Sequence, residues 1–203
     1  MTTDRLGTFS DAVFGVAITL LVLDLRVPIE PGGTAPPILD LIRTELPAHI
    51  AFFASFIIIG LNWISHHNMV AKIERIDNGL LLLNLFLLLW VCFVPFTTAL
   101  LAAYAVRPQG CYAAMLYGAV WAIGGLCSVG LWHYAVRRRL VNAAEVPPGA
   151  KVSWLRYCIA PAGYVFGALV SLLSVGLAIA IFILLAGLNL MPMTRGREPT
   201  AAR

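Results

Sequence analysis

Residues 5–27 read RLGTFSDAVFGVAITLLVLDLRV, an apolar run with one polar pair, Ser10 and Asp11, one to two turns from its start. At a rise of about 1.5 Å per residue, a helix of this length crosses a hydrocarbon core of about 30 Å. Asp11 and Asp24 bracket the apolar centre and no small-residue cleavage site follows, which is not typical of a cleaved signal peptide. The stretch therefore predicts a transmembrane helix that is retained in the protein.

The composition of the whole chain agrees with this prediction. Of the 203 residues, 60% are hydrophobic and 12% are charged, whereas soluble domains are about 45–50% apolar and about 25% charged. The mean hydropathy is +0.87. Because backbone polar groups in lipid must pair within each segment, an all-α membrane protein is predicted. Intrinsic disorder, a collagen-like fibre, a disulfide scaffold and a nucleic-acid-binding domain are excluded. The four cysteines form no CxxC pair and are interpreted as small buried hydrophobes.

Apolar runs of similar length predict six spans in all. The last run, from Trp154 to Met191, is almost uncharged and about twice as long as one span, so we place a tight turn around residues 171–175. The predicted spans cover residues 6–27, 48–70, 80–104, 112–134, 154–171 and 175–191. Residues 1–203 thus form a single transmembrane domain. A small interfacial helix is predicted for Ile38–Leu46, and a disordered cytoplasmic tail for residues 192–203.

Basic residues predict the orientation of these spans. An even number of spans places both termini on one side, and eleven of the fourteen Lys and Arg residues fall on that side. They are Arg5, Lys72, Arg75, Arg137, Arg138, Arg139, Lys151, Arg156, Arg195, Arg197 and Arg203. Since basic residues are retained in the cytoplasm, both termini are predicted to be cytoplasmic. The same bias explains the net charge of +4 more simply than an anionic partner does.

Polar residues inside the spans need partners, because an ionisable side chain there costs about 2.5–3.5 kcal/mol on insertion scales. Asp11 and Ser10 must find theirs on neighbouring helices of the same subunit. The candidates are Asn62, Trp63, His66 and His67 on the second span, and Asn84 and the Pro95–Thr98 break on the third. Adjacent histidines on a helix point about 100° apart, which makes them a weak metal pair. We therefore favour a structural hydrogen-bond cluster, with a proton relay or a metal site as the alternatives.

One face of the first span carries only apolar side chains and a single hydroxyl. At about 100° per residue, Val16, Leu20 and Leu23 fall on one stripe together with Ala12, and Thr19 lies at its edge. Asp11 lies about 140° away from Val16 on the same helix. Taken alone, such a stripe indicates ordinary helix packing. The stripe and the polar pair are therefore expected to face different surroundings.

A family resemblance changes the interpretation of this stripe. The string Arg5-xxx-Phe9-Ser10-Asp11, followed by AVFGVAITLLVLD, resembles the opening of the transmembrane protein 175 family of endosomal and lysosomal potassium channels, in its prokaryotic branch. The resemblance covers residues 5 to about 100. Its further positions are Trp63, His66, His67, Asn84 and the Pro95-Phe96-x-Thr98 segment. It implies a tetramer of six-helix subunits around a central pore, with the first helix of each subunit lining that pore.

The resemblance also implies roles for single residues. The family lacks the TVGYG filter of other potassium channels, and its pore constriction is a set of apolar side chains that correspond here to Val16, Leu20 and Leu23. Thr19 corresponds to the threonine linked to potassium preference. Val16 replaces the more usual isoleucine or leucine, so the tightest ring is expected to be wider, or to lie at Leu20 or Leu23. The motif residues Arg5 and Asp11 are expected to hold the helix and the subunit together and not to touch ions.

The function predicted from these features is passive K⁺ transport by a weakly selective cation leak channel, in which Na⁺, Cs⁺ or H⁺ also permeate. A proton-conducting channel or a proton-coupled secondary transporter is the alternative. No GxSxG, HExxH or Walker A motif is present, so the chain is not expected to be an enzyme. No cofactor and no metal other than permeating K⁺ is expected. The expected location is the inner membrane of a bacterial cell, in contact with membrane lipid.

Overall fold

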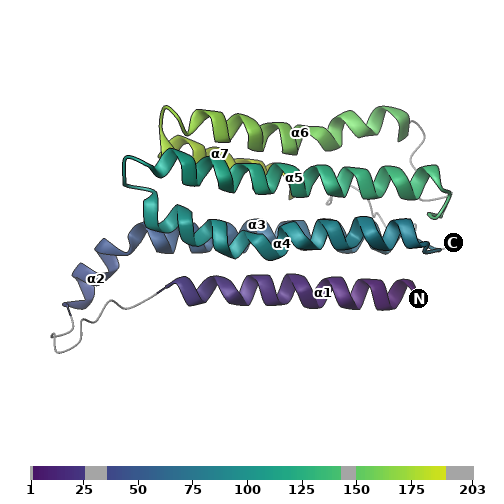
Figure 1. Cartoon of the computed structure of the whole chain (residues 1–203), viewed down its shortest axis with the longest axis horizontal. Helices are drawn as coiled ribbons and strands as arrows, with labels where there is room; N and C mark the ends of the chain where they lie inside the picture. The colour runs from purple at the N-terminus through teal and green to yellow at the C-terminus, as the bar shows by residue number, and fades with distance from the viewer. Residues whose placement is uncertain (1, 26–35, 143–149, 191–203) are drawn as a thin grey trace, which may run out of the picture.

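The computed structural model describes residues 2–25, 36–142 and 150–190, and the side chains of residues 2–25, 36–142 and 158–187. Figure 1 shows long helices lying side by side, with α1 at one edge of the bundle. The elements are α1 (Thr3–Leu20), the 3₁₀-helix η1 (Leu21–Asp24), α2 (Ile38–Thr44), α3 (Leu46–Val70), α4 (Asn78–Tyr104), α5 (Gly110–Arg137), α6 (Ala150–Val170) and α7 (Val175–Leu190). The chain is an all-α protein in the parts that the structure describes.

Four helical segments are long and apolar enough to cross a membrane: Thr3–Asp24, Leu46–Val70, Asn78–Tyr104 and Gly110–Arg137. The described parts of α6 and α7 contain two shorter apolar helices, Cys158–Val170 and Val175–Gly187. The chain is therefore an integral membrane protein with several apolar spans. The turn between α6 and α7 covers residues 171–174, where the sequence predicted one. That α6 and α7 also span the membrane, which would make six spans, stays a prediction.

The helices differ most from the predicted spans at the end of the first span. The first span was predicted as one helix over residues 6–27, but α1 ends at Leu20 and a 3₁₀ turn follows, closed by a bond of 3.1 Å from the Leu25 N–H to the Val22 carbonyl. Such turns satisfy the last carbonyls of a helix. A short helix was predicted for Ile38–Leu46, and the structure has α2 over Ile38–Thr44, whereas Leu46 begins α3. That α2 lies at the membrane interface stays a prediction. Residues 26–35, 143–149 and the predicted tail 192–203 lie outside the described residues.

The bundle is held together by close packing of aromatic and small side chains at the side opposite α1. The rings of Tyr117 and Trp121 on α5, Tyr164 on α6 and Phe182 on α7 contact one another, with centroids 5.4–6.3 Å apart. A Cβ atom added to Gly163 or Gly167 would come within 2.6 Å of the α7 side chains Leu185 and Phe182. The Gly-xxx-Gly pair of α6 is therefore a close-packing face toward α7.

Basic residues gather at the end of the bundle where α1 begins. The α3–α4 and α5–α6 connections meet there in an isolated antiparallel bridge between Ile73 and Val141. The backbone N–H groups of Glu74 and Arg75 both donate to the Leu140 carbonyl, at 2.8 and 3.1 Å. Leu6 of α1 belongs to the same buried cluster as Ile73 and Val141. The arginines on these connections and at the start of α1 therefore share one end of the molecule, as the orientation argument requires.

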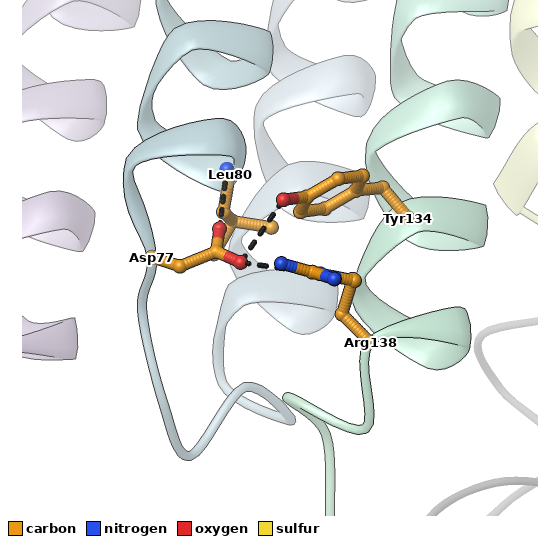
Figure 2. A network of polar contacts seen from close by, with 4 residues as sticks. All are labelled: Asp77, Leu80, Tyr134 and Arg138. Carbon is orange, nitrogen blue, oxygen red and sulfur yellow. Dashed lines mark hydrogen bonds and ion pairs between the residues drawn. The ribbon is translucent and has the colours of Figure 1, made fainter.

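A polar cluster joins α4 to α5 at this end (Figure 2). The Asp77 side chain caps α4 by accepting a hydrogen bond from the Leu80 N–H at 2.8 Å, and it accepts another from the Tyr134 hydroxyl at 2.9 Å. The Arg138 guanidinium lies 3.7 Å from the same carboxylate. These contacts, led by the Leu80 N–H, hold the pKa of Asp77 below its usual value. The charged carboxylate is thus the form that the fold stabilises.

Replacing Asp77 with alanine is expected to lower the melting temperature of the detergent-solubilised protein near neutral pH. Because the pKa of Asp77 is lower in the folded chain than in the unfolded one, its contribution is present above the unfolded pKa of 3.8 and is lost as the pH falls through the folded value. The difference in melting temperature between parent and variant should therefore shrink below about pH 4. The exposed Asp40 is the control, and Asp40→Ala should have little effect at either pH. A difference that is independent of pH would contradict this account.

Candidate functional site

The side chains of α1 and η1 divide into a buried and an exposed face. The buried ones are Leu6, Ser10, Phe14, Ala17 and Leu21. The exposed ones beyond the first two turns are Ala12, Gly15, Val16, Thr19, Leu20, Val22 and Leu23. The buried face packs on α3 and α4, which lie between α1 and the rest of the bundle in Figure 1. The other face of α1 is open in the single chain.

A buried chain of hydrogen bonds ties α1 to α4 and α3. The Ser10 hydroxyl donates to the Leu6 carbonyl at 2.9 Å and accepts from the Asn84 side-chain amide at 3.0 Å. The Asn84 carbonyl oxygen lies 2.8 Å from His66 Nε2. Since this oxygen can only accept, His66 Nε2 carries the proton and donates. The direction of every bond in the chain from His66 to Leu6 is therefore determined, and all three side chains are buried.

Asp11 has a different partner on α3. Its carboxylate accepts a hydrogen bond of 2.7 Å from the Trp63 indole N–H. The ring of His67 packs beside the Trp63 ring, with centroids 5.8 Å apart, and His67 is exposed. The two adjacent histidines thus face different surroundings, as their spacing on a helix requires. Among the described side chains, no group of three or more His, Cys, Asp or Glu residues could hold a metal ion.

The apolar stripe lies on the open face of α1. Val16 is 56% exposed, Leu20 is 41% exposed and Leu23 is 63% exposed. Thr19 is also exposed, and its hydroxyl donates to the Val16 carbonyl at 2.9 Å, which leaves the oxygen lone pairs free to accept. Val22, which the sequence did not single out, is 52% exposed beside them. This face can therefore line a narrow apolar passage with one ring of hydroxyl oxygens.

Arg5 and Phe9, the first two residues of the motif, are not part of the polar network. Both are exposed, and Phe9 lies on the same face of α1 as Val16, two turns away. No hydrogen bond or ion pair joins the guanidinium of Arg5 to the described residues of this chain. The structure thus brings together Ser10, Asp11, Trp63, His66 and Asn84. It leaves Arg5 and Phe9 exposed on the surface of the single chain.

A second buried polar cluster was missed in the sequence. The Ser55 hydroxyl on α3 lies 2.8 Å from the Thr98 hydroxyl on α4 and 3.0 Å from the Tyr117 hydroxyl on α5. Ser55 precedes Asn62 by seven residues and His66 by eleven, so all three lie on one face of α3. That spacing was visible in the sequence and could have identified the face. The partner on α5 could not be inferred, because Tyr117 is one of several aromatic residues in its span.

The comparisons with known proteins agree on one family. The family described as "Endosomal/lysosomal potassium channel TMEM175" matches residues 5–95. A potassium channel of Streptomyces collinus is 33% identical over 196 residues, which is 93% of both chains. The endosomal/lysosomal proton channel TMEM175 of Gallus gallus is 25% identical over 150 residues, and the match covers 71% of this chain and 29% of that protein.

A solved structure agrees over almost the whole chain. It is the crystal structure of a lysosomal potassium-selective channel TMEM175 homolog from Chamaesiphon minutus. The sequence identity is 30%, the TM-score is 0.81, and the match covers 95% of this chain and 98% of the other. The similarity therefore extends through α6 and α7, beyond the segment that the family description matches.

Replacing Asn84 with leucine is expected to reduce the free energy of unfolding by about 1–3 kcal/mol, because the buried His66 N–H then has no acceptor. Ser10 is less affected, since it still donates to the Leu6 carbonyl. Denaturant titration in detergent measures the change. Asn78→Leu at the exposed start of α4 is the control and should be near neutral. Equal stability of Asn84→Leu and the parent would show that the chain of hydrogen bonds contributes nothing to holding α1.

Proposed function

Because this chain belongs to the TMEM175 family, we propose that it forms a weakly selective cation channel through which K⁺ crosses the membrane passively. Membership confirms the resemblance drawn from the Arg5-xxx-Phe9-Ser10-Asp11 motif. Since the family is one of ion channels, the prediction that the chain is not an enzyme is also confirmed. The observation that carries the proposal is the exposed apolar face of α1, whose Val16, Leu20 and Leu23 side chains are 41–63% exposed in the single chain.

A single subunit cannot enclose a pore with one helix at its edge, so the proposal includes assembly. Four copies with six spans each surround one axis, and each contributes its α1. This arrangement covers the stripe of every subunit and buries it against the stripes of the others. It also places the exposed residues Arg5 and Phe9 near neighbouring subunits, which gives these two motif positions a role that the single chain does not offer.

The constriction in this proposal is a dry neck made of Val16, Leu20 and Leu23. Rings of apolar side chains gate a pore by dewetting, and an ion must shed much of its hydration to pass. Without a cage of carbonyl groups in compensation, the barrier is lower for K⁺ than for Na⁺, because K⁺ holds its water less strongly. Thr19 adds hydroxyl oxygens beside the neck and contributes to the preference for K⁺. Conductance through such a pore is small.

The membrane orientation follows from the basic end of the bundle. Arg5, Arg75 and the arginines at residues 137–139 lie at the end where α1 begins, so this end faces the cytoplasm. Both termini are then cytoplasmic, and α2 lies at the opposite surface with Ile38, Leu39 and Ile42 exposed toward the lipid interface. We place the channel in the inner membrane of a bacterial cell.

Proton conduction is the alternative function. It is favoured by the Gallus gallus relative, which is a proton channel, and by the contacts that lead from Asp11 to Trp63 and from the Trp63 ring to the ring of His67. The two functions differ in liposomes. A K⁺ gradient with a potential-sensitive dye reports K⁺ flux, whereas a pH gradient at equal K⁺ on both sides reports protons alone. A membrane potential that forms only with the pH gradient would favour the alternative.

Assembly is expected to be tetrameric and to depend on Asp11. Native mass spectrometry in mild detergent should report four subunits for the parent. Asp11→Ala should lower the yield of tetramer, because the Trp63 indole N–H loses its acceptor and α1 loses one of its two anchors. The reversal potential of the remaining channels should not change. Asp40→Ala on α2 is the control. A fully active monomer, or normal tetramers with altered ion preference, would overturn this part of the proposal.

Polar substitutions in the neck are expected to raise the current. Leu20→Asn or Leu23→Asn admits water into the constriction, which lowers the dehydration barrier and reduces the preference for K⁺ over Na⁺. Thr19→Ala should reduce that preference without raising the conductance. Single-channel recordings and reversal potentials measure both properties.

The control for these variants is Leu82→Asn. Leu82 is an exposed apolar residue on α4 and is not part of the proposed pore lining. It is expected to leave the conductance unchanged. If the stripe only packs against other helices, asparagine at Leu20 or Leu23 buries a polar group without a partner and lowers expression with no gain of current. Intact tetramers in which neither asparagine raises the conductance would show that the pore does not run along this face.

A further inference from the structure

The interior of the subunit contains a small cavity behind α1. Its walls come from α1, α3, α4 and α5, and the polar residues among them are Asn62, His66, Trp90, Trp121 and Ser128. Phe14 closes it on the side of α1, and the Phe14 ring lies 5.5 Å from the His66 ring. We propose that this cavity is a binding site for one water molecule, which connects the polar chain of His66 to the two tryptophans of α4 and α5.

The tryptophans supply the donors. The Nε1 atoms of Trp90 and Trp121 are buried and have no hydrogen-bond partner among the described residues. An indole N–H can only donate, and buried donors in proteins almost always find an acceptor. Both rings line the cavity, and Trp121 is almost fully buried. An acceptor placed in the cavity is therefore what these two groups require.

The other polar walls supply acceptors. Asn62 donates its amide N–H to the Ile58 carbonyl at 2.9 Å, so its own carbonyl oxygen remains available. Ser128 donates to the Gly124 carbonyl at 3.1 Å and keeps its oxygen lone pairs. His66 donates through Nε2, so the neutral ring offers Nδ1 as an acceptor. A ligand that both accepts and donates hydrogen bonds matches this set of groups.

Size and charge select water as that ligand. The room open to the centre of a water molecule is about 20 Å³. One buried water needs about 10–15 Å³ on this measure and two to four polar partners. A permeating cation is disfavoured, because the two indole N–H groups present the positive ends of their dipoles. The bound water extends the chain of Ser10, Asn84 and His66 to α5, so α1 is connected to the second layer of the bundle.

Solid-state NMR of the ¹⁵N-tryptophan-labelled protein in liposomes tests the site. The indole signals are assigned with Trp90→Phe and Trp121→Phe. At short mixing times, magnetisation from water should reach the Trp90 and Trp121 indole N–H groups in the parent protein. Gly124 lines the cavity, and a Cβ atom there would meet Trp90 Cβ at an ordinary distance of 3.7 Å. Gly124→Val should fill the cavity and abolish both transfers, and Gly124→Ala is the smaller substitution if the valine does not fold.

Gly130→Val is the matched control, because Gly130 lies on the same helix with open space around its Cβ position. It should leave the transfers unchanged. Ser128→Ala removes one acceptor without filling the cavity and should weaken them. Absence of transfer to both indoles in the parent would overturn the proposal, as would transfer that persists when the cavity is filled in a folded Gly124 variant. The readout does not depend on ion flux, so it stands apart from the proposed channel function.

Discussion

The rotation of α1 about its own axis is the constraint on which the rest of the site depends. Beyond Asp11, Thr19 is the one polar side chain of α1, and in lipid an apolar side chain gains little by facing protein instead of hydrocarbon. Hydrophobicity therefore cannot decide which face turns inward. The hydrogen bonds of Ser10 to Asn84 and of Asp11 to Trp63 can, because an unpaired polar group in lipid is costly. These two bonds turn Val16, Leu20 and Leu23 outward.

The partners of α1 are themselves held by the layers behind them. His66 and Asn84 form one buried hydrogen bond between α3 and α4. A second buried cluster, made of Ser55, Thr98 and Tyr117, extends from α3 and α4 to α5. Both use the same face of α3. Behind them, the aromatic rings of α5, α6 and α7 contact one another, and α7 packs closely on the glycines of α6. A shift of α1 would therefore disturb contacts throughout the bundle.

The cost of burying polar groups in lipid also explains which parts of the fold and of the site could be predicted from the sequence. The span lengths and the polar pair of α1 could be predicted, because membrane thickness sets the length of an apolar run and a polar residue within such a run is conspicuous. The stripe was readable because Asp11 marks the opposite side of the helix. The hydrogen-bond partner of Asp11 could not be predicted from the sequence, because Trp63 and two histidines were all candidates. Which of them it contacts depends on how α1 and α3 cross. The 3₁₀ end of the first span and the Tyr117 hydroxyl bonds likewise depend on tertiary packing.

Asp77 shows where the boundary between local and tertiary information lies. An aspartate three residues before a long apolar run is a typical helix N-cap, and its bond to the Leu80 N–H is a local consequence of sequence. Its hydrogen bond with Tyr134 and its ion pair with Arg138 join residues about sixty positions apart and arise only after α4 and α5 pack. The same distinction applies to α1. Local sequence supplies the apolar stripe, whereas packing on α3 and α4 determines which way the stripe faces. In the proposed channel, selection among ions by dehydration requires the stripes to stay in register, because a wider neck would fill with water.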